Sequence, residues 1–271
     1  MFCVKSPHMA HIMCISNQKG GVGKTTTAIN LSAALAASEK NTLIVDCDPQ
    51  ANATTGIGID KNSLKDTLYH GMIGRADPEQ LILNTEIRTL KIIPSRVELI
   101  GFEVEMMSTP GREKVLKKLL HHLRDSFEYI VLDCPPSLSL LTINAMTAAD
   151  SVLIPLQCEF YALEGLGQLL QTVKRIRQHL NPKLKIAGIL LTMFDKRTNL
   201  SHQVAEDAER YFKDLVFKTI VPRNVRLGEA PSFGKPILLY DATSAGAESY
   251  LNLAKEILNN NRSSGQLQKV D

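Results

Sequence analysis

The sequence predicts an α/β fold in which a mostly parallel, doubly wound sheet carries helices on both faces. Runs of apolar, β-prone residues alternate with segments of helical spacing along most of the chain. The apolar runs are nearly continuous, which is typical of strands buried on both faces. At 271 residues and 44% hydrophobic content, the chain can form one large core.

The expected strands are short segments rich in apolar and β-branched side chains. They are residues 11–16, 42–46, 90–94, 129–133, 151–156, 186–193 and 216–221. Between them, apolar residues recur every three or four positions, which favours helices. The expected helices are residues 25–38, 112–124, 139–149, 163–179, 201–212 and 245–258.

The chain shows no internal repeat, and we expect a single domain at residues 10–258. Residues 1–9 are expected to be an N-terminal extension without ordered structure. They do not resemble a signal peptide, because no apolar segment with a small-residue cleavage site follows them. Residues 259–271 form a polar C-terminal tail. No apolar run approaches the roughly 20 residues that span a bilayer, so we expect a cytoplasmic protein.

The five cysteines show no C-x-x-C spacing. Cys14, Cys47 and Cys134 lie in apolar runs that are expected to be buried. This placement indicates small apolar side chains in a reducing compartment. An iron–sulfur or zinc site needs clustered thiols, which the sequence lacks.

A glycine-rich segment joins the first expected strand to the first expected helix. Its glycines, Gly20, Gly21 and Gly23, allow the backbone to curl and point N–H groups inward, and the helix dipole adds to this attraction for anions. The strand–loop–helix context is that of a P-loop. We assign a nucleotide's phosphates to Lys19, Gly20, Gly21, Val22, Gly23, Lys24, Thr25 and Thr26.

Two side chains of this loop carry its chemistry. Lys24 is expected to reach the β- and γ-phosphates, and the Thr25 hydroxyl is expected to bind Mg²⁺. Gln18 stands where the strict P-loop pattern has its first glycine. Lys19 followed by two glycines replaces that pattern, which is the deviant Walker A form. A glycine-rich turn that binds nothing is the alternative, and the Lys-Thr pair argues against it.

Carboxylates follow two of the expected strands. Residues 42–46 end in Asp46-Cys47-Asp48, and residues 129–133 end in Asp133, which is the Walker B pattern. Ligands of parallel sheets bind at the carboxyl ends of the strands. An acid at a strand end is often only a helix cap, but its occurrence together with a P-loop favours a metal site. Asp133 is expected to hold Mg²⁺ through water.

Four motifs in this order resemble the ParA/Soj family of chromosome and plasmid partition ATPases. They are Lys19-Gly-Gly-Val-Gly-Lys-Thr-Thr, Asp46-Cys-Asp-Pro-Gln, Asp133-Cys-Pro-Pro-Ser and Pro222-Arg-Asn-Val-Arg-Leu. The resemblance covers residues 10–258. It implies a slow ATPase that uses ATP and Mg²⁺ and acts as an ATP-dependent sandwich homodimer.

The resemblance also implies roles for single residues. Lys19 matches the signature lysine that reaches the partner subunit's phosphates, and Gly20 matches a glycine whose substitution blocks the dimer by crowding. Asp48 matches the carboxylate that positions the attacking water; with Lys19 and Lys24 it completes the implied catalytic set. The positions that match the family's adenine contacts are Met193, Pro222, Arg223 and Asn224.

Positive charge is concentrated in residues 171–235, which contain thirteen Lys/Arg and six Asp/Glu within a chain of net charge +3. Such a segment is either an ordinary solvated face or the footprint of a polyanion. Arg197 and Arg226 match family positions that bind double-stranded DNA without regard to sequence. Lys196, Arg223 and Lys235 are further candidates. With no recognition-helix motif, we expect phosphate contacts that weaken as salt rises.

The family resemblance implies a ParB-like, centromere-bound partner that stimulates hydrolysis through a basic N-terminal peptide. It also implies a nucleoid-associated protein that does not bind membrane. The motifs do not distinguish a chromosome from a plasmid as cargo. Because the chain lacks a long N-terminal DNA-reading extension, we do not expect it to repress its own promoter.

Specific features of the sequence bear on other functions. A MinD-like membrane-cycling ATPase needs a basic amphipathic helix at the C-terminus, which residues 259–265 are expected to break. A metallocluster carrier needs paired cysteines, for which Cys134 and Cys158 are the candidates. A scaffold with a vestigial site disagrees with the intact loop and carboxylates. The seven histidines lie near no nucleophile motif, so a triad enzyme has no support.

Overall fold

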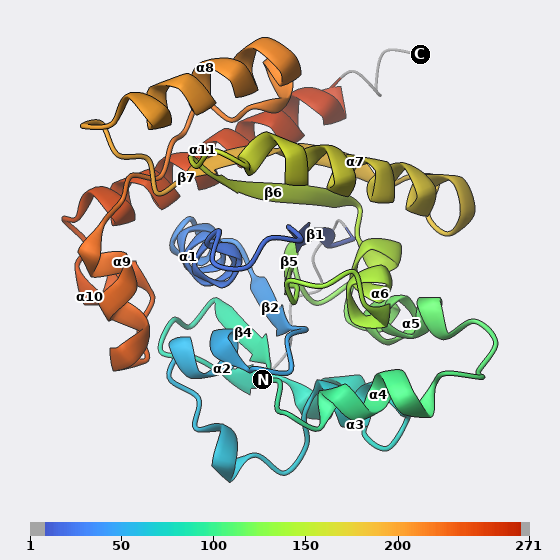
Figure 1. Ribbon diagram of the computed structural model, residues 1–271. Helices are drawn as coiled ribbons and strands as arrows, with labels where there is room; N and C mark the ends of the chain where they lie inside the picture. Colours follow the sequence, from blue (N-terminus) through green and yellow to red (C-terminus); the bar gives the residue numbers. More distant parts are fainter. Residues whose placement is uncertain (1–8, 267–271) are drawn as a thin grey trace.

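A computed structural model describes residues 9–266, with side chains for residues 9–260. Its centre is a seven-stranded sheet in the order β3-β4-β2-β5-β1-β6-β7 (Figure 1). The strands are β1 (His11–Ile15), β2 (Thr42–Asp46), β3 (Leu83–Asn84), β4 (Leu90–Ile93), β5 (Tyr129–Asp133), β6 (Ser151–Gln157) and β7 (Lys185–Thr192). All neighbours pair in parallel except β3 with β4. The predicted fold class is therefore confirmed.

Helices cover both faces of the sheet. One face carries α3 (Leu68–Met72), α4 (Leu99–Glu105), α5 (Val115–His121), α6 (Leu140–Ala148), α7 (Ala162–His179) and α8 (Asn199–Phe212). The other carries α1 (Lys24–Ala37), α2 (Asn52–Gly56), α9 (Val225–Glu229), α10 (Ile237–Tyr240) and α11 (Ala245–Gln266). Each face has its own apolar core, so the central strands are buried on both sides.

Strand register brings the sequence motifs together. Ile15, at the end of β1, pairs with Asp133 at the end of β5, and Asp46 at the end of β2 pairs with the same residue. Parallel strands place their carboxyl ends at one edge of the sheet. The glycine-rich loop and both carboxylate motifs therefore meet at that edge.

The strand expected at residues 216–221 does not form. Two isolated bridges, Ile189 with Val216 and Phe194 with Pro222, connect this segment to β7 and to a residue just after it. A further hydrogen bond runs from the Val221 amide to the Leu191 carbonyl. The bridges are five residues apart on the β7 side and six apart on the other, so a regular ladder cannot run between them. The apolar pattern correctly indicated an extended, buried segment, but it does not show how the residues of this segment align with those of β7.

The C-terminal helix was expected to end at residue 258, and it continues to Gln266. Residues 259–266 contain no proline, so nothing in them forces the helix to stop. The expected helix break at residues 259–265 is therefore wrong, and it is the polar composition of this segment that differs from a membrane-binding amphipathic helix. Within residues 9–266, no helix is both long enough and apolar enough to cross a bilayer. Residues 1–8 and 267–271 lie outside the described part.

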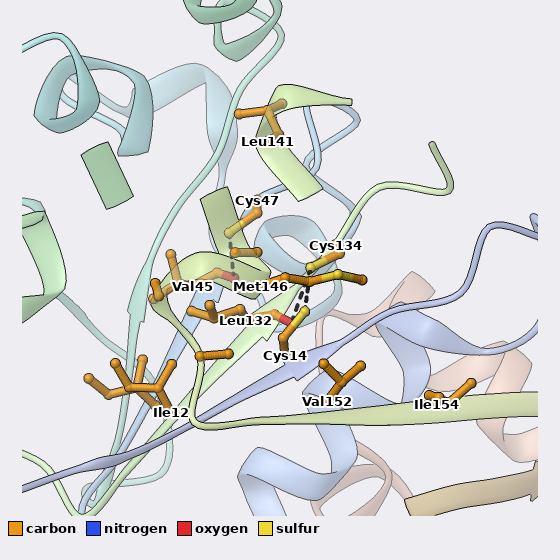
Figure 2. Packing of buried hydrophobic residues seen from close by; sticks show 14 of the residues in the cluster. Ile12, Cys14, Val45, Cys47, Leu132, Cys134, Leu141, Met146, Val152 and Ile154 are labelled. Atoms are coloured by element: carbon orange, nitrogen blue, oxygen red, sulfur yellow. Dashed lines mark hydrogen bonds between the residues drawn. The ribbon is translucent and has the colours of Figure 1, made fainter. Parts of the chain in front are cut away.

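The four cysteines within residues 9–266 are buried, as expected of small apolar side chains. Cys14, Cys47 and Cys134 are buried in the core beneath α6 (Figure 2). The sulfur atoms of Cys14 and Cys134 lie 3.2 Å apart, and burial raises the pKa of the Cys47 thiol well above its usual value. Cys134 and Cys158, the candidates for a metallocluster, are both buried rather than paired at a surface.

Candidate active site and DNA surface

The glycine-rich loop adopts the conformation that its sequence predicts. Gly21 and Gly23 have φ values of 74° and 87°, a region that residues with a Cβ atom rarely adopt. The Thr27 amide donates to the Gly23 carbonyl at 2.9 Å, which starts α1 at the end of the loop. The loop thus leads directly into a helix N-terminus, where an anion is stabilised.

Three contacts that sequence analysis did not identify fix the position of the loop. Asn17 donates to the Pro155 carbonyl at 2.7 Å and accepts from the Lys19 amide at 3.0 Å. At the other side, the Thr192 hydroxyl donates to the Val22 carbonyl at 2.9 Å. The last contact joins residues 170 positions apart in the chain, so no local pattern could have revealed it.

The Lys24 side chain packs against the glycine-rich loop. Its side chain is almost fully buried and donates from Nζ to the Lys19 carbonyl at 2.9 Å. Burial lowers the pKa of Lys24, while the negative charge of Asp133 opposes that shift. Thr25 and Thr26 line a cavity of about 250 Å³ beside the loop. The ammonium group is therefore positioned under the turn in which phosphates are expected.

Asp133 is the most unusual carboxylate of the site. It is fully buried, and neither of its oxygens makes a hydrogen bond. Burial raises its pKa well above the usual value, the charges of Asp46 and Asp48 raise it further, and Thr25 and Lys24 oppose the shift. A buried carboxylate next to a threonine hydroxyl and a phosphate cradle is an oxygen-rich donor set, which fits Mg²⁺.

Asp46 has a structural role. It is fully buried, and its two oxygens accept hydrogen bonds from the Thr54 amide and hydroxyl at 2.8 and 2.7 Å and from the Asp48 amide at 3.1 Å. Burial raises its pKa to about 6. These contacts fold residues 46–54 into a fixed turn. The turn places Asp48 at the same edge of the sheet as Asp133, where its own carboxylate accepts from the Gln50 amide at 2.9 Å.

Lys19 is engaged within its own chain. Its ammonium group lies 2.8 Å from a carboxylate oxygen of Glu159, which follows β6, and Gln157 donates to the other oxygen of that carboxylate. Both members of the ion pair are partly exposed, at 39% and 45% of their side-chain surface. Sequence analysis did not identify Glu159, because 140 residues separate it from Lys19.

The residues predicted to surround adenine come together. Met193 has a φ of 50°, which turns the chain sharply after β7. The next residue, Phe194, accepts at its carbonyl from the Arg223 amide at 2.9 Å. Asn224 accepts from the Leu227 amide at 3.4 Å and begins α9. The four predicted positions therefore form two adjoining turns, and Thr192 links the first of these turns to the phosphate loop.

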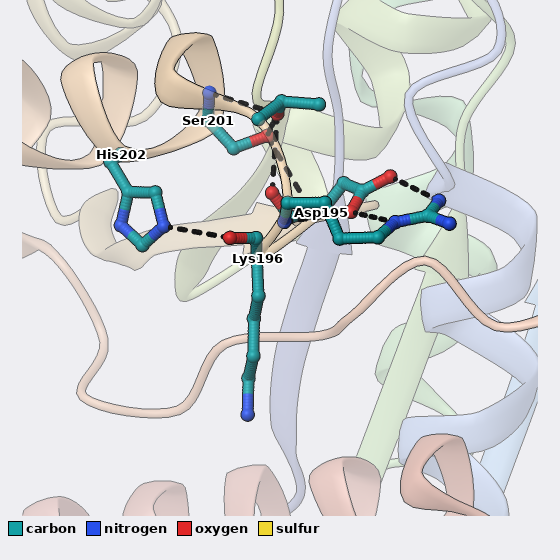
Figure 3. A network of polar contacts seen from close by, with 6 residues as sticks. Asp195, Lys196, Ser201 and His202 are labelled. Atoms are coloured by element: carbon teal, nitrogen blue, oxygen red, sulfur yellow. Dashed lines mark hydrogen bonds and ion pairs between the residues drawn. The ribbon is translucent and has the colours of Figure 1, made fainter.

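Arg197 lies on an exposed turn before α8. Its guanidinium donates two hydrogen bonds to Asp195, at 2.9 and 2.8 Å, while 84% of its side chain remains exposed. These bonds hold the pKa of Asp195 well below its usual value, and the charge of Arg223 lowers it further. Lys196 takes part in the same turn through its carbonyl, which accepts from His202, and its ammonium end extends away from the network (Figure 3).

Arg226 lies on α9, the helix that follows the second of the two adjoining turns. It pairs with Glu229 at 3.0 Å and with Asp241 at 3.5 Å, and 55% of its side chain is exposed. Because the Arg223 amide donates a hydrogen bond to the Phe194 carbonyl, the turn that carries Arg197 lies beside the segment that leads into α9 and Arg226. Lys235 is placed differently, since it is half-buried and lines the small cavity that also contains Thr25 and Thr26.

Comparisons with known proteins agree with this geometry. Residues 10–186 match a family described as an AAA domain. The chromosome partitioning protein ParA of Myxococcus xanthus is 56% identical over 92% of this chain and 88% of its own length. The sporulation initiation inhibitor protein Soj of Bacillus subtilis is 55% identical over 93% of this chain and 100% of its own length.

A solved structure extends the similarity to three dimensions. It is described as cobyrinic acid a,c-diamide synthase of Mycobacterium smegmatis with bound ADP and magnesium. It superimposes with a TM-score of 0.84 at 34% identity, covering 94% of this chain and 97% of the other. The fold, the loop with its buried lysine and carboxylate, and the identities over nearly the whole chain lead to one assignment. The chain belongs to the ParA/Soj family of chromosome-partitioning ATPases.

Proposed function

We propose that this ATPase works as a switch on DNA, in which ATP and Mg²⁺ bind at residues 19–26 and hold two copies of the chain together as a sandwich homodimer. The dimer binds double-stranded DNA without sequence preference. Slow hydrolysis returns the protein to monomers that leave the DNA. Repeated cycles of this kind, in the cytoplasm and on the nucleoid, drive the segregation of a chromosome or plasmid.

The observation that carries the proposal is the buried Asp133 carboxylate, which lacks hydrogen bonds and lies next to the phosphate loop. Thr25 and Lys24 compensate this buried carboxylate only in part, so its charge stays costly and persists where a ligand completes the compensation. Asp133 and the Thr25 hydroxyl would hold Mg²⁺ here, and its positive charge would compensate the carboxylate. The ADP and magnesium in the structure of the mycobacterial relative support the same ligands here.

Each polar residue of the site has a role in hydrolysis. Lys24 neutralises charge on the β- and γ-phosphates, and the amides of the loop bind the phosphate oxygens. Asp48 positions the attacking water. Phosphoryl transfer depends mainly on positioning and on neutralising charge, and Mg²⁺ contributes to both when bound. This division of roles needs no proton shuttle or covalent intermediate.

Dimerisation makes hydrolysis conditional. Lys19 leaves Glu159 and reaches the phosphates bound by the partner subunit, so a full set of cations forms only in the dimer. Gly20 supports this arrangement, because a Cβ atom placed on it meets no other atom of its own chain within 4 Å. Crowding at this position would therefore come from a second copy and not from the fold itself.

DNA binds through the surface formed by Arg197 and Arg226. Both side chains are exposed, and each is paired with an acid that phosphate oxygens would replace. Lys196 and Arg223 lie on the same two turns and add positive charge. The half-buried Lys235 is a weaker candidate. A dimer presents two such surfaces, which couples DNA affinity to ATP.

A ParB-like protein stimulates hydrolysis and so decides where dimers dissociate. This role follows from the family and from the low activity expected of a site that a partner subunit must complete. We propose that the stimulating segment is a basic peptide. Membrane has no part in this cycle.

The first test measures binding to arbitrary double-stranded DNA with ATP, ADP or no nucleotide, at two salt concentrations. Wild-type protein is expected to bind in ATP and to weaken steeply with salt. Arg197→Glu should abolish binding, whereas Arg210→Glu, the same charge change at the far end of α8, should reduce it much less. Equal and negligible binding in all nucleotide states would refute the proposal.

A second test separates dimerisation from hydrolysis. Asp48→Ala should remain dimeric and bound to DNA in ATP, because the carboxylate acts after the dimer has formed. Size-exclusion chromatography with light scattering measures the dimer, and phosphate release measures turnover. A variant that fails to dimerise would show that Asp48 has another role.

A further inference from the structure

An apolar stripe on α4 faces solvent although the opposite side of the same helix packs into the core. Its members are Val97, Ile100, Val104 and Met107, whose exposures are 61%, 53%, 67% and 65%. At roughly 100° per residue, these positions fall within an arc of about 80° on one side of the helix. Turns at both ends extend the helical path to Val97 and Met107. Isolated exposed apolar residues are common, but a continuous stripe indicates an interaction site.

Glutamates border this stripe on both sides. Glu103 lies along one border, and Glu98 and Glu105 lie along the other, as the helical spacing requires. No lysine or arginine occurs between Arg96 and Arg112. Glu98 pairs with Arg96, whereas Glu105 accepts from the Tyr69 hydroxyl and Glu103 from a backbone amide. Two of the three carboxylates therefore lack a cationic partner within the part of the chain that the structure describes.

The stripe is connected to the catalytic turn by a short chain of hydrogen bonds. The Thr54 hydroxyl donates to Asp46 at 2.7 Å and accepts from the Ser95 amide at 2.9 Å. Ser95 is two residues before Val97, the first residue of the stripe, and Asp46 accepts from the Asp48 amide. Thr54 and Ser95 are buried, so this link is shielded from water. This link joins the segment before α4 to Asp48, the residue proposed to position the attacking water.

We propose that this stripe is the docking surface for a basic amphipathic segment of a partner protein, with apolar side chains against α4 and lysine or arginine side chains against Glu103 and Glu105. The inference rests on the proposed function, because it gives the stimulating peptide of the ParB-like partner a place to bind. The acidic borders disfavour DNA and anionic lipid as occupants, and they would repel the same borders of a second copy.

The experiment uses the full chain and a double variant, Ile100→Gln/Val104→Gln. Both positions are exposed, and glutamine favours helix at least as well as the residues it replaces, so the fold and basal ATPase are expected to stay unchanged. Tyr211→Gln on α8 is the matched control, because Tyr211 is an apolar side chain that is 67% exposed and lies outside the stripe. The partner is the ParB-like protein of the same organism.

A second probe is a synthetic 18-residue helix with leucine on one face and lysine on the other. It is compared with a scrambled peptide of the same composition and with a leucine–glutamate version. Binding is measured by fluorescence anisotropy. The double variant should bind both probes about tenfold more weakly or worse, as expected when central interface residues are lost. Glu103→Gln/Glu105→Gln should also weaken the lysine peptide and flatten its salt dependence.

The outcomes separate the two hypotheses. If the ParB-like protein stimulates the double variant as it does wild type, with equal affinity, the docking surface is wrong and the proposed function stands. If the ParB-like protein does not stimulate wild type at all, its proposed role as the stimulating partner is wrong. Binding of the lysine peptide then tests the docking surface by itself. Equal binding of the lysine peptide to both proteins would overturn the inference, as would a double variant that loses only ATP-dependent dimerisation.

Discussion

Replacing Asp133 with asparagine should stabilise the nucleotide-free protein while abolishing its Mg²⁺-dependent activity. A pKa unit corresponds to about 1.4 kcal/mol. The rise in the pKa of Asp46 from 3.8 to about 6 thus corresponds to about 3 kcal/mol. Asp133 is as deeply buried, and burial raises its pKa in the same direction, so the Asp46 figure sets the order of magnitude for the cost of its charge. The buried amide of asparagine, without acceptors, returns about 1–2 kcal/mol of that gain.

The net stabilisation is therefore about 1–2 kcal/mol at pH 7, or a rise in melting temperature of about 2–8 °C for a chain of this size. Because the folded-state pKa of Asp133 is raised, the native carboxyl binds a proton more readily than the unfolded one. The wild-type penalty therefore grows as the pH rises above the unfolded pKa and disappears as the pH falls toward it.

The assay is thermal unfolding of wild type and Asp133→Asn without nucleotide or metal, at pH 7 and pH 5. The difference should shrink at pH 5. Asp125→Asn, at an exposed acid, is the control and should stay within about 0.5 kcal/mol of wild type. ATP with Mg²⁺ should stabilise wild type but not Asp133→Asn. A variant that is less stable at pH 7, or a difference independent of pH, would refute the reasoning.

Three further substitutions test separate contacts. Glu159→Gln frees Lys19 from a partly exposed pair worth about 0.2–1 kcal/mol. Two such pairs break per dimer, so ATP-dependent dimerisation should tighten by up to about thirtyfold in sedimentation velocity; an unchanged dimer constant would show that the Lys19–Glu159 pair does not restrain dimerisation. Gly20→Val should melt like wild type without nucleotide yet fail to dimerise in ATP, and lower stability without nucleotide would contradict this. Gly188→Ala places a Cβ atom 2.6 Å from the Phe217 ring, at a residue whose φ is 157°. The free energy of unfolding, measured in guanidinium, should fall by about 1–3 kcal/mol. An unchanged unfolding midpoint would mean that the ring moves aside.

The sequence predicted the sheet well because buried parallel strands are long apolar runs. The phosphate loop was equally visible, since its glycines and lysine are consecutive. Apart from the strand at 90–94, residues 52–105 were not predicted, because elements such as α2 and α3 are single turns shorter than any periodic signal. The segment at 216–221 was taken for a strand because its apolar pattern reports burial and not hydrogen-bond partners.

Site residues that belong to a run of consecutive motif residues could be predicted from the sequence. Site residues whose partners are far away in the chain could not. Lys24, Thr25 and Asp133 were identified from motifs, and the structure brings them together. Asn17, Glu159 and Thr192 were missed, because their partners lie 138 to 170 positions away. The roles of Arg197 and Arg226 remain predictions that rest on family resemblance and on their neighbouring turns.

The two edges of the sheet affect how copies of this protein associate. At one border lies β3, a two-residue antiparallel strand, and at the other the irregular segment 216–222 covers part of β7. Long, regular strands at a border invite pairing between molecules and aggregation. Here both borders are blunted. When many copies crowd onto a nucleoid, as proposed, they can reach high local concentration without fusing their sheets into fibres, and association stays under the control of the nucleotide.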